Sequence, residues 1–265
     1  MVMETKITVL DKPKLNNPIL IEGLPGIGNV GRVAAGYLID QTKAVKFAEL
    51  YSSHFLPFVL VHENSEIALL KNEFYYIKGK KGGRDIIVLI GDAQSLDQIG
   101  HYEIAEKILE FVESFGCKEI YTLGGLGTGQ LETPNPKVFG ALTSQKMKKK
   151  LESYGVDFSV ASKLGTIVGA SGLLLGLGKL RGMDGVCLMG ETAGFPIVTD
   201  PKSAEAVLKI LMKILGMNVD LKTLDQRVKE MESFINKIEN LQRKAVEEMT
   251  RGVQKEGKED LRYIG

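Results

Sequence analysis

Strand-length apolar runs and helix-length amphipathic segments alternate through residues 1–217, and this alternation restricts the folds open to the chain. Such alternation is typical of a mostly parallel sheet with helices on its faces. Asp85–Gly91 is continuously apolar after its first residue, as expected for a central strand covered on both faces. We therefore predict an α/β fold with a mostly parallel sheet flanked by helices.

The expected strands are short apolar runs next to turn residues. They are the first segment, ending near Leu10, and Pro18–Glu22, Ala44–Leu50, Asp85–Gly91, Glu119–Gly124 and Gly185–Gly190. The expected helices carry apolar residues at three- and four-residue steps. They are Asn29–Gln41, Leu96–Phe115, Asn135–Ser153 and Lys202–Leu215. Between Phe55 and Lys78, strand-like pieces follow one another without a helix, which predicts hairpin strands that widen one edge of the sheet.

Composition is that of a folded globular protein, with 44% hydrophobic and 25% charged residues. The 34 basic and 33 acidic residues give a formal charge of +1, so no excess field attracts nucleic acid or an anionic membrane. We expect no signal peptide and no membrane span. Two cysteines, Cys117 and Cys187, lie in or beside apolar runs and fit buried free thiols in a reducing compartment. We expect a cytoplasmic protein.

Thirty glycines are unevenly distributed, and they gather where predicted strands end. The clusters lie in residues 23–31, 124–129, 165–178 and 190–194. In open α/β sheets, the loops at the carboxyl ends of the strands form the rim where ligands bind. Because glycine also permits tight turns and close packing of helices, both a ligand site and a purely structural role stay open at this point.

The first cluster contains the pattern G-x-G-x-x-G in Gly26–Gly31, after a strand and at a helix start. In a dinucleotide-binding fold, such a loop approaches a pyrophosphate, and Glu49 at the end of the next strand would bind the ribose. However, Leu24 and Pro25 lengthen the turn, and no substrate domain or proton-transfer residue accompanies the motif. We predict no cofactor.

Other catalytic and metal-binding patterns are missing from the sequence. His54, His62 and His101 are dispersed, and there is no Cys-x-x-Cys pair or Walker-type loop, so no metal or nucleotide site is predicted. Ser171 lies outside the G-x-S-x-G frame of hydrolases, and Glu191 is a single acidic residue on a glycine-rich loop. We predict no catalytic residue. The alternative is an enzyme or binding protein for a nucleoside, nucleotide or phosphorylated small molecule at the glycine-rich loops.

Beyond residue 217 the pattern changes to one long amphipathic helix without glycine or proline, followed by a charged, glycine-broken tail. The chain thus divides into a core domain 1–217, an oligomerising helix 218–250 and a flexible tail 251–265. The helix, a rod of roughly 45 Å, has the spacing of a coiled-coil seam, although packing on its own domain is the alternative. The predicted oligomerisation residues are Leu221, Leu224, Val228, Met231, Ile235 and Ile238.

Three glycine motifs together resemble the archaeal proteasome assembly chaperone family. They are Gly23–Gly31, Gly124–Gly127, and Gly190-Glu-Thr followed by Pro196 and Asp200. The similarity spans Leu20–Leu215. The resemblance implies a fold like that of nucleoside phosphorylases and related hydrolases, although no catalysis is established for the family. It also implies a homo-oligomer (trimer to pentamer, with the tetramer favoured) and binding to the proteasome core particle.

In that family, a C-terminal tail with the pattern hydrophobic–tyrosine–any residue inserts between α subunits. Here Tyr263 is third from the end, and Arg262 precedes it where an apolar residue is expected. By the resemblance, the partner-binding anchor comprises Leu261, Tyr263, Ile264 and Gly265 with its carboxylate. We predict a non-enzymatic factor that binds the α-ring through its tails, as an assembly chaperone or an ATP-independent activator.

Overall fold

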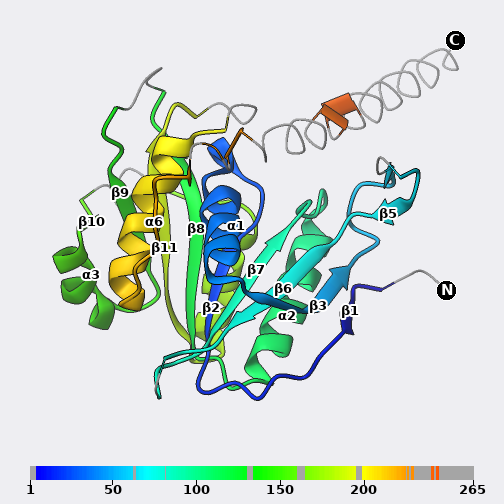
Figure 1. The fold of residues 1–265 in the computed structure, drawn as a ribbon, viewed down its shortest axis with the longest axis horizontal. Coiled ribbons are helices and arrows are strands. Elements are labelled where there is room, and N and C mark those ends of the chain that lie inside the picture. Colours follow the sequence, from blue (N-terminus) through cyan, green and yellow to red (C-terminus); the bar gives the residue numbers. More distant parts are fainter. Residues whose placement is uncertain are drawn as a thin grey trace, which may run out of the picture.

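The computed structural model describes residues 4–61, 64–80, 82–129, 134–159, 165–194 and 199–224, with residues 226, 228, 229, 240, 241, 243 and 244 of the C-terminal extension. These residues form a sheet with helices on both faces (Figure 1). Within this part of the chain, no helix combines the length and hydrophobicity that crossing a membrane requires.

A nine-stranded sheet has the order β1-β3-β6-β7-β2-β8-β11-β9-β10, and β4 and β5 form a separate pair. The strands are β1 (Lys6–Val9), β2 (Ile19–Gly23), β3 (Val45–Tyr51), β4 (Val59–Val61), β5 (Ile67–Leu69), β6 (Asn72–Ile77), β7 (Ile86–Gly91), β8 (Glu119–Gly127), β9 (Val138–Leu142), β10 (Val156–Asp157) and β11 (Asp184–Thr192). The helices are η1 (Ile27–Asn29), α1 (Val30–Thr42), α2 (Gln98–Glu113), η2 (Gln145–Met147), α3 (Lys148–Tyr154), α5 (Ala170–Leu180) and α6 (Pro201–Leu215).

The centre of the sheet is parallel and its flanks are largely antiparallel. Strands β7, β2, β8 and β11 run in the same direction side by side. Strands β6, β3 and β1 extend one flank in antiparallel order, and β9 pairs antiparallel with β11 on the other flank before β10 joins it in parallel. The predicted α/β class is therefore confirmed, with a mixed sheet whose four central strands are parallel.

Helices cover both faces because the side chains of the central strands alternate between two apolar clusters. Ile19 and Ile21 of β2 join the cluster that α1 and α6 cover, which we call the α1 layer. Leu20, between them, joins the cluster that α2 and α5 cover, the α5 layer. The continuous apolar sequence of β7, and that of β2 apart from Glu22, follows from this burial on both sides.

Most predicted elements are present, but the predicted helix Asn135–Ser153 is wrong in its first half. Residues Val138–Leu142 form strand β9, and helix α3 begins only at Lys148. Gly140 gives the physical reason. A Cβ at this position would lie 2.4 Å from a ring carbon of Phe158, so the strand needs glycine there to pack this ring. In a helix interior, the same glycine would cost about 1 kcal/mol relative to alanine.

The C-terminal extension begins against α1 of its own chain. The hydroxyl of Tyr37 donates to the carbonyl of Asp220 and lies 2.9 Å from Oγ1 of Thr223. Leu224 and Val228, each 1% exposed, are part of the α1 layer. Leu221 packs on that layer too, whereas Leu241 packs against the α5 layer.

The rest of the seam and the anchor lie outside the described residues. These predicted residues are Met231, Ile235, Ile238, Leu261, Tyr263, Ile264 and Gly265. The long coiled-coil helix and its role in self-association therefore stay predictions.

Candidate functional site

The glycine-rich loops meet at the carboxyl ends of β2, β8 and β11, and they line a cavity of about 940 Å³ that we call the rim pocket. Its wall includes residues 24–27, 123–128 and 166–169 and the side chains of Gln94, Ser171 and Glu191. The chain places β7 on one side of β2 and β8 on the other, so the pocket lies at the topological switch point where open α/β sheets bind ligands. The prediction that these loops share one rim is confirmed.

Two glycines of the rim are required for close packing of η1 and α1 on β8. A Cβ on Gly31 would lie 2.1 Å from the carbonyl oxygen of Leu123, and one on Gly125 would lie 2.4 Å from that of Ile27. Gly28 has a φ of +63°, which favours glycine as well. In contrast, Gly26 has extended backbone and nothing within 4 Å of a Cβ. The G-x-G-x-x-G pattern is thus explained mainly by helix–strand packing.

Glu49 does not approach the glycine motif. Its strand β3 is separated from β2 by β6 and β7. Burial alone would raise the pKa of Glu49, but hydrogen bonds from Lys46, Lys71 and Tyr51 outweigh burial and lower this pKa to about 2. The strand order therefore rules out the dinucleotide-type arrangement in which this carboxylate would bind a ribose beside the loop.

Glu22, in the strand that leads to the rim pocket, is a buried carboxyl group bonded to two residues of the pocket wall, and the sequence pattern does not reveal it. Its side chain is buried, and the two carboxyl oxygens accept hydrogen bonds from the backbone N–H of Leu24 and from Oγ of Ser171, each at 2.9 Å. Burial raises the pKa of Glu22 to about 7 despite these two bonds, which lower it. The one signal in the sequence is a carboxylate near the end of an otherwise apolar strand.

Gln94 joins two walls of the rim pocket. Its Nε2 donates to the carbonyl of Pro25 at 2.6 Å, and its Oε1 accepts from the backbone N–H of Ala170 at 2.8 Å. The loop after β2 and the first turn of α5 are thereby held at a fixed separation. Sequence reasoning missed this residue, since its partners are remote in the chain.

His54 and His101, the two histidines in the described part of the chain, have different surroundings. His101 lines the rim pocket, whereas His54 lies between two carboxylates of the first turns of α2, with Nδ1 2.8 Å from Asp97 and Nε2 3.3 Å from Glu103. The hydrogen bond with Asp97 is the largest of the effects that raise the pKa of His54. His62 lies outside the described residues. Among the residues that are described, no group of three or more histidine, cysteine or acidic side chains is arranged to hold a metal ion.

Both cysteines are buried free thiols, as the sequence predicted. Cys187 lines the rim pocket, but burial raises its thiol pKa to about 12, so the nucleophilic thiolate is scarce at neutral pH.

The lining of the rim pocket is apolar over most of its surface. Glu191 is its one carboxylate, and neither lysine nor arginine lines it within the described part of the chain. Protein sites for phosphate groups use cationic side chains or clusters of free backbone N–H groups. The charges of this wall suit an apolar occupant with a cationic or hydrogen-bond-donating group, rather than a phosphorylated one.

The model of the PAC2 family matches residues 20–239. The chain belongs to the PAC2 family. This match covers the α/β core together with the first part of the C-terminal extension, and it confirms the family resemblance inferred from the glycine motifs.

Three known proteins are similar to this chain over nearly their whole lengths. A Methanocaldococcus jannaschii protein is 43% identical over 259 residues, 97% of this chain and 96% of that protein. The crystal structure of Pyrococcus furiosus PbaB, an archaeal proteasome activator, is 46% identical with a TM-score of 0.80, covering 89% of this chain and 99% of PbaB. Pyrococcus furiosus PbaA, an archaeal homologue of proteasome-assembly chaperone, is 30% identical with a TM-score of 0.73, covering 91% and 99%.

Proposed function

We propose that this chain is a non-enzymatic, cytoplasmic protein-binding factor that self-assembles and binds the α-ring of the proteasome core particle through its C-terminal tails. It would act as an assembly chaperone or as an ATP-independent activator. The observation that carries this proposal is the 46% identity to PbaB, an archaeal proteasome activator, over 99% of the PbaB chain. The similarity to PbaA, a homologue of a proteasome-assembly chaperone, supports the same class of partner.

The hydrogen bonds among the polar groups of the rim favour a structural role for these groups rather than a catalytic one. Gln94 uses both ends of its amide to join two loops, and the carboxyl oxygens of Glu22 are bonded to Ser171 and Leu24. Buried polar groups that are satisfied in this way stabilise one arrangement of the loops. We infer that the α/β core holds the C-terminal segments in place and that these segments make the functional contacts.

Self-association is the second part of the proposal. Leu224 and Val228 are covered by their own chain, so the seam that pairs with other copies begins beyond them, with Met231, Ile235 and Ile238. Several tails on one oligomer bind one ring together, because each bound tail raises the effective concentration of the others. Weak individual anchors then suffice for stable binding.

Co-elution tests the choice of partner. The purified chain and a purified archaeal core particle are mixed and separated by size-exclusion chromatography, with each component alone as the control. We expect the chain to move into the core-particle fraction and the complex to persist without nucleotide. Elution of the two components at their separate positions, at concentrations well above micromolar, would contradict the proposal.

The alternative is an enzyme or binding protein for a nucleoside, nucleotide or phosphorylated small molecule, and the size of the rim pocket is the observation that favours it. A ligand that binds only the native state raises its melting temperature. Thermal-shift measurements with nucleosides, nucleotides and sugar phosphates separate the two functions, since a large shift with one of them supports the alternative.

A further inference from the structure

The floor of the rim pocket is bare backbone. On β8, Tyr121 and Leu123 belong to the α1 layer, so Gly124 faces the opposite side of the sheet, toward the α5 layer. A Cβ at Gly124 would have no neighbouring atom within 4 Å. Of the glycines that the structure describes, only Gly26, Gly124 and Gly176 combine such open space with a φ that any residue can adopt. Neither close packing nor backbone conformation explains these three glycines.

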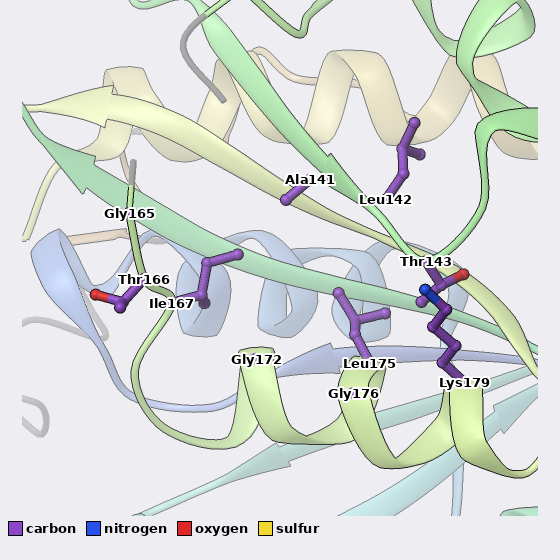
Figure 2. A pocket seen from close by; sticks show the side chains of 10 residues that line it. All are labelled: Ala141, Leu142, Thr143, Gly165, Thr166, Ile167, Gly172, Leu175, Gly176 and Lys179. Atoms are coloured by element: carbon purple, nitrogen blue, oxygen red, sulfur yellow. The ribbon is translucent and has the colours of Figure 1, made fainter. Parts of the chain in front are cut away.

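Two of these glycines line the rim pocket, and the third lines a neighbouring cavity. Gly26 and Gly124 lie in the wall of the rim pocket. Gly176 lies on α5 in a cavity of about 370 Å³ between α5 and β9, which shares Thr166 and Ile167 with the rim pocket (Figure 2). Glycine inside a strand destabilises that strand, and it marks a place where a ligand or another backbone approaches closely. Gly124, inside β8, therefore indicates a ligand on the floor of the rim pocket.

The size and the walls of the rim pocket define the body of this ligand. Its volume of about 940 Å³ lies within the range of sites for small organic molecules. Met189 is the neighbour of Gly124 on β11, and Ile27, Leu126 and Ile167 belong to the same apolar wall. A body of one or two apolar rings can lie flat on the bare backbone and contact these side chains.

Glu191 indicates the charge of the ligand. Cys187 and Met189 of β11 belong to the α5 layer, so Glu191, two residues further along, faces the same side. One oxygen of its carboxylate accepts the backbone N–H of Lys137 at 3.3 Å. Within the described part of the chain, the other oxygen has no hydrogen bond, and no lysine or arginine lines the pocket. The carboxylate is thus available to a cation.

Ser171 adds a second acceptor to the wall. Its hydroxyl donates to Glu22 at 2.9 Å, so the lone pairs of its Oγ remain for a donor in the pocket. Gln94, in contrast, uses both ends of its amide within the protein, and His101 can either accept or donate. An ammonium group has three donors and no acceptor, so it matches both Glu191 and Ser171.

We propose that the rim pocket binds a small organic cation, in which an ammonium group is attached to an apolar body of one or two rings. The ammonium group lies toward Glu191 and Ser171, and the rings lie on Gly124. This ligand site is additional to the protein-binding function proposed above and involves no reaction. Phosphorylated compounds are disfavoured, because no described cationic side chain of the wall would neutralise them.

Isothermal titration calorimetry with compounds of one shape tests the charge of the ligand. The probes are 1-naphthylmethylamine, 1-naphthalenemethanol and 1-naphthoate, titrated into the full chain at pH 8, where an imidazole is normally neutral. We expect saturable binding of the amine, about fivefold tighter than that of the alcohol, and no measurable binding of the carboxylate. Equal affinity of the amine and the alcohol, or absence of saturable binding by all these probes, would overturn the proposal.

A matched pair of carboxylate variants locates the charge contact. Glu191→Gln should remove the preference for the amine and leave the affinity for the alcohol unaltered, because only the cation interacts with the carboxylate charge. Glu66→Gln, the same change at an exposed position far along the chain, should alter neither affinity. A preference for the amine that survives in Glu191→Gln would contradict the assigned orientation.

A second matched pair locates the body of the ligand. Gly124→Leu and Gly176→Leu place the same side chain in the two neighbouring cavities. We expect Gly124→Leu to weaken binding of the amine at least about tenfold, because leucine occupies the floor of the rim pocket, and Gly176→Leu to leave it unaltered. Melting temperatures no lower than that of the parent establish that the fold is intact; if Gly124→Leu melts lower, the Glu191→Gln comparison decides. Undiminished binding by a folded Gly124→Leu variant would overturn the proposal, whether or not the chain binds the core particle.

Discussion

At the scale of single residues, Glu22 has an environment with a measurable consequence. Its carboxyl group has a pKa near 7 in the folded chain because burial disfavours the charged form, against 4.5 for the ordinary side chain. Between these two values the folded state binds a proton that the unfolded state has lost, so stability falls as the pH rises from 4.5 to 7. Above pH 7 the folded chain contains a buried carboxylate at Glu22. The destabilisation that its burial causes then no longer changes with pH.

Replacement of Glu22 by glutamine removes this titration. The amide keeps an acceptor for Leu24 and a partner for Ser171, so we expect Glu22→Gln to unfold like the parent at pH 4.5 and to be more stable by about 3 kcal/mol at pH 8. Urea unfolding at pH 4.5, 6 and 8 measures the difference. A gap between the two proteins that does not change with pH would show that Glu22 is not the titrating group.

At the scale of elements, the contact of α1 with β8 depends on bare backbone. Gly31 and Gly26 belong to the same motif, but a Cβ on Gly31 would overlap the backbone of β8, whereas a Cβ on Gly26 meets open space. Neither position requires a positive φ, so a difference in stability between alanine variants at the two positions reports packing alone.

The two alanine variants form a matched pair. Gly31→Ala should lose about 2–3 kcal/mol of stability because α1 must move off β8, while Gly26→Ala should stay within about 0.5 kcal/mol of the parent. Chemical denaturation of both variants under one set of conditions checks this expectation. If both variants lost similar stability, the motif would have a role other than helix–strand packing.

The elements also show how far sequence patterns determine this fold. The positions of the central strands and of helices α1, α2 and α6 follow from apolar runs and helical spacing, and the glycine clusters indicate which loops form the rim. Helix α5 was not predicted, because its sequence is rich in glycine. Strand β9 was missed, because the need for Gly140 arises only when Phe158 is packed against it. The separation of Glu49 from the glycine motif and the bond of Ser171 to Glu22 both depend on the strand order, which no local pattern contains.

At the scale of the whole molecule, the proposed function requires several chains to act together. Leu224 and Val228 attach the start of the extension to the core of the same chain, so substitutions there would disturb the fold as well as any assembly. Substitutions further along the seam avoid this overlap.

Met231, Ile235 and Ile238 are therefore the positions to change. With all three replaced by aspartate, charges fall on the proposed seam and we expect dissociation to the 29.0 kDa monomer, with the melting temperature of the core little changed. Light scattering after size-exclusion chromatography gives the mass. An oligomer of unaltered mass would mean that the chains associate through another surface.

The tails are the central element of the account, and truncation tests them most directly. An archaeal core particle is immobilised, and binding of the full chain is compared with that of a chain ending at Asp260, after light scattering has established that both form the same oligomer. Because several weak anchors act together, we predict that loss of residues 261–265 weakens binding at least ~100-fold. Equal affinity of the two proteins would contradict the account and assign the contact to the α/β core.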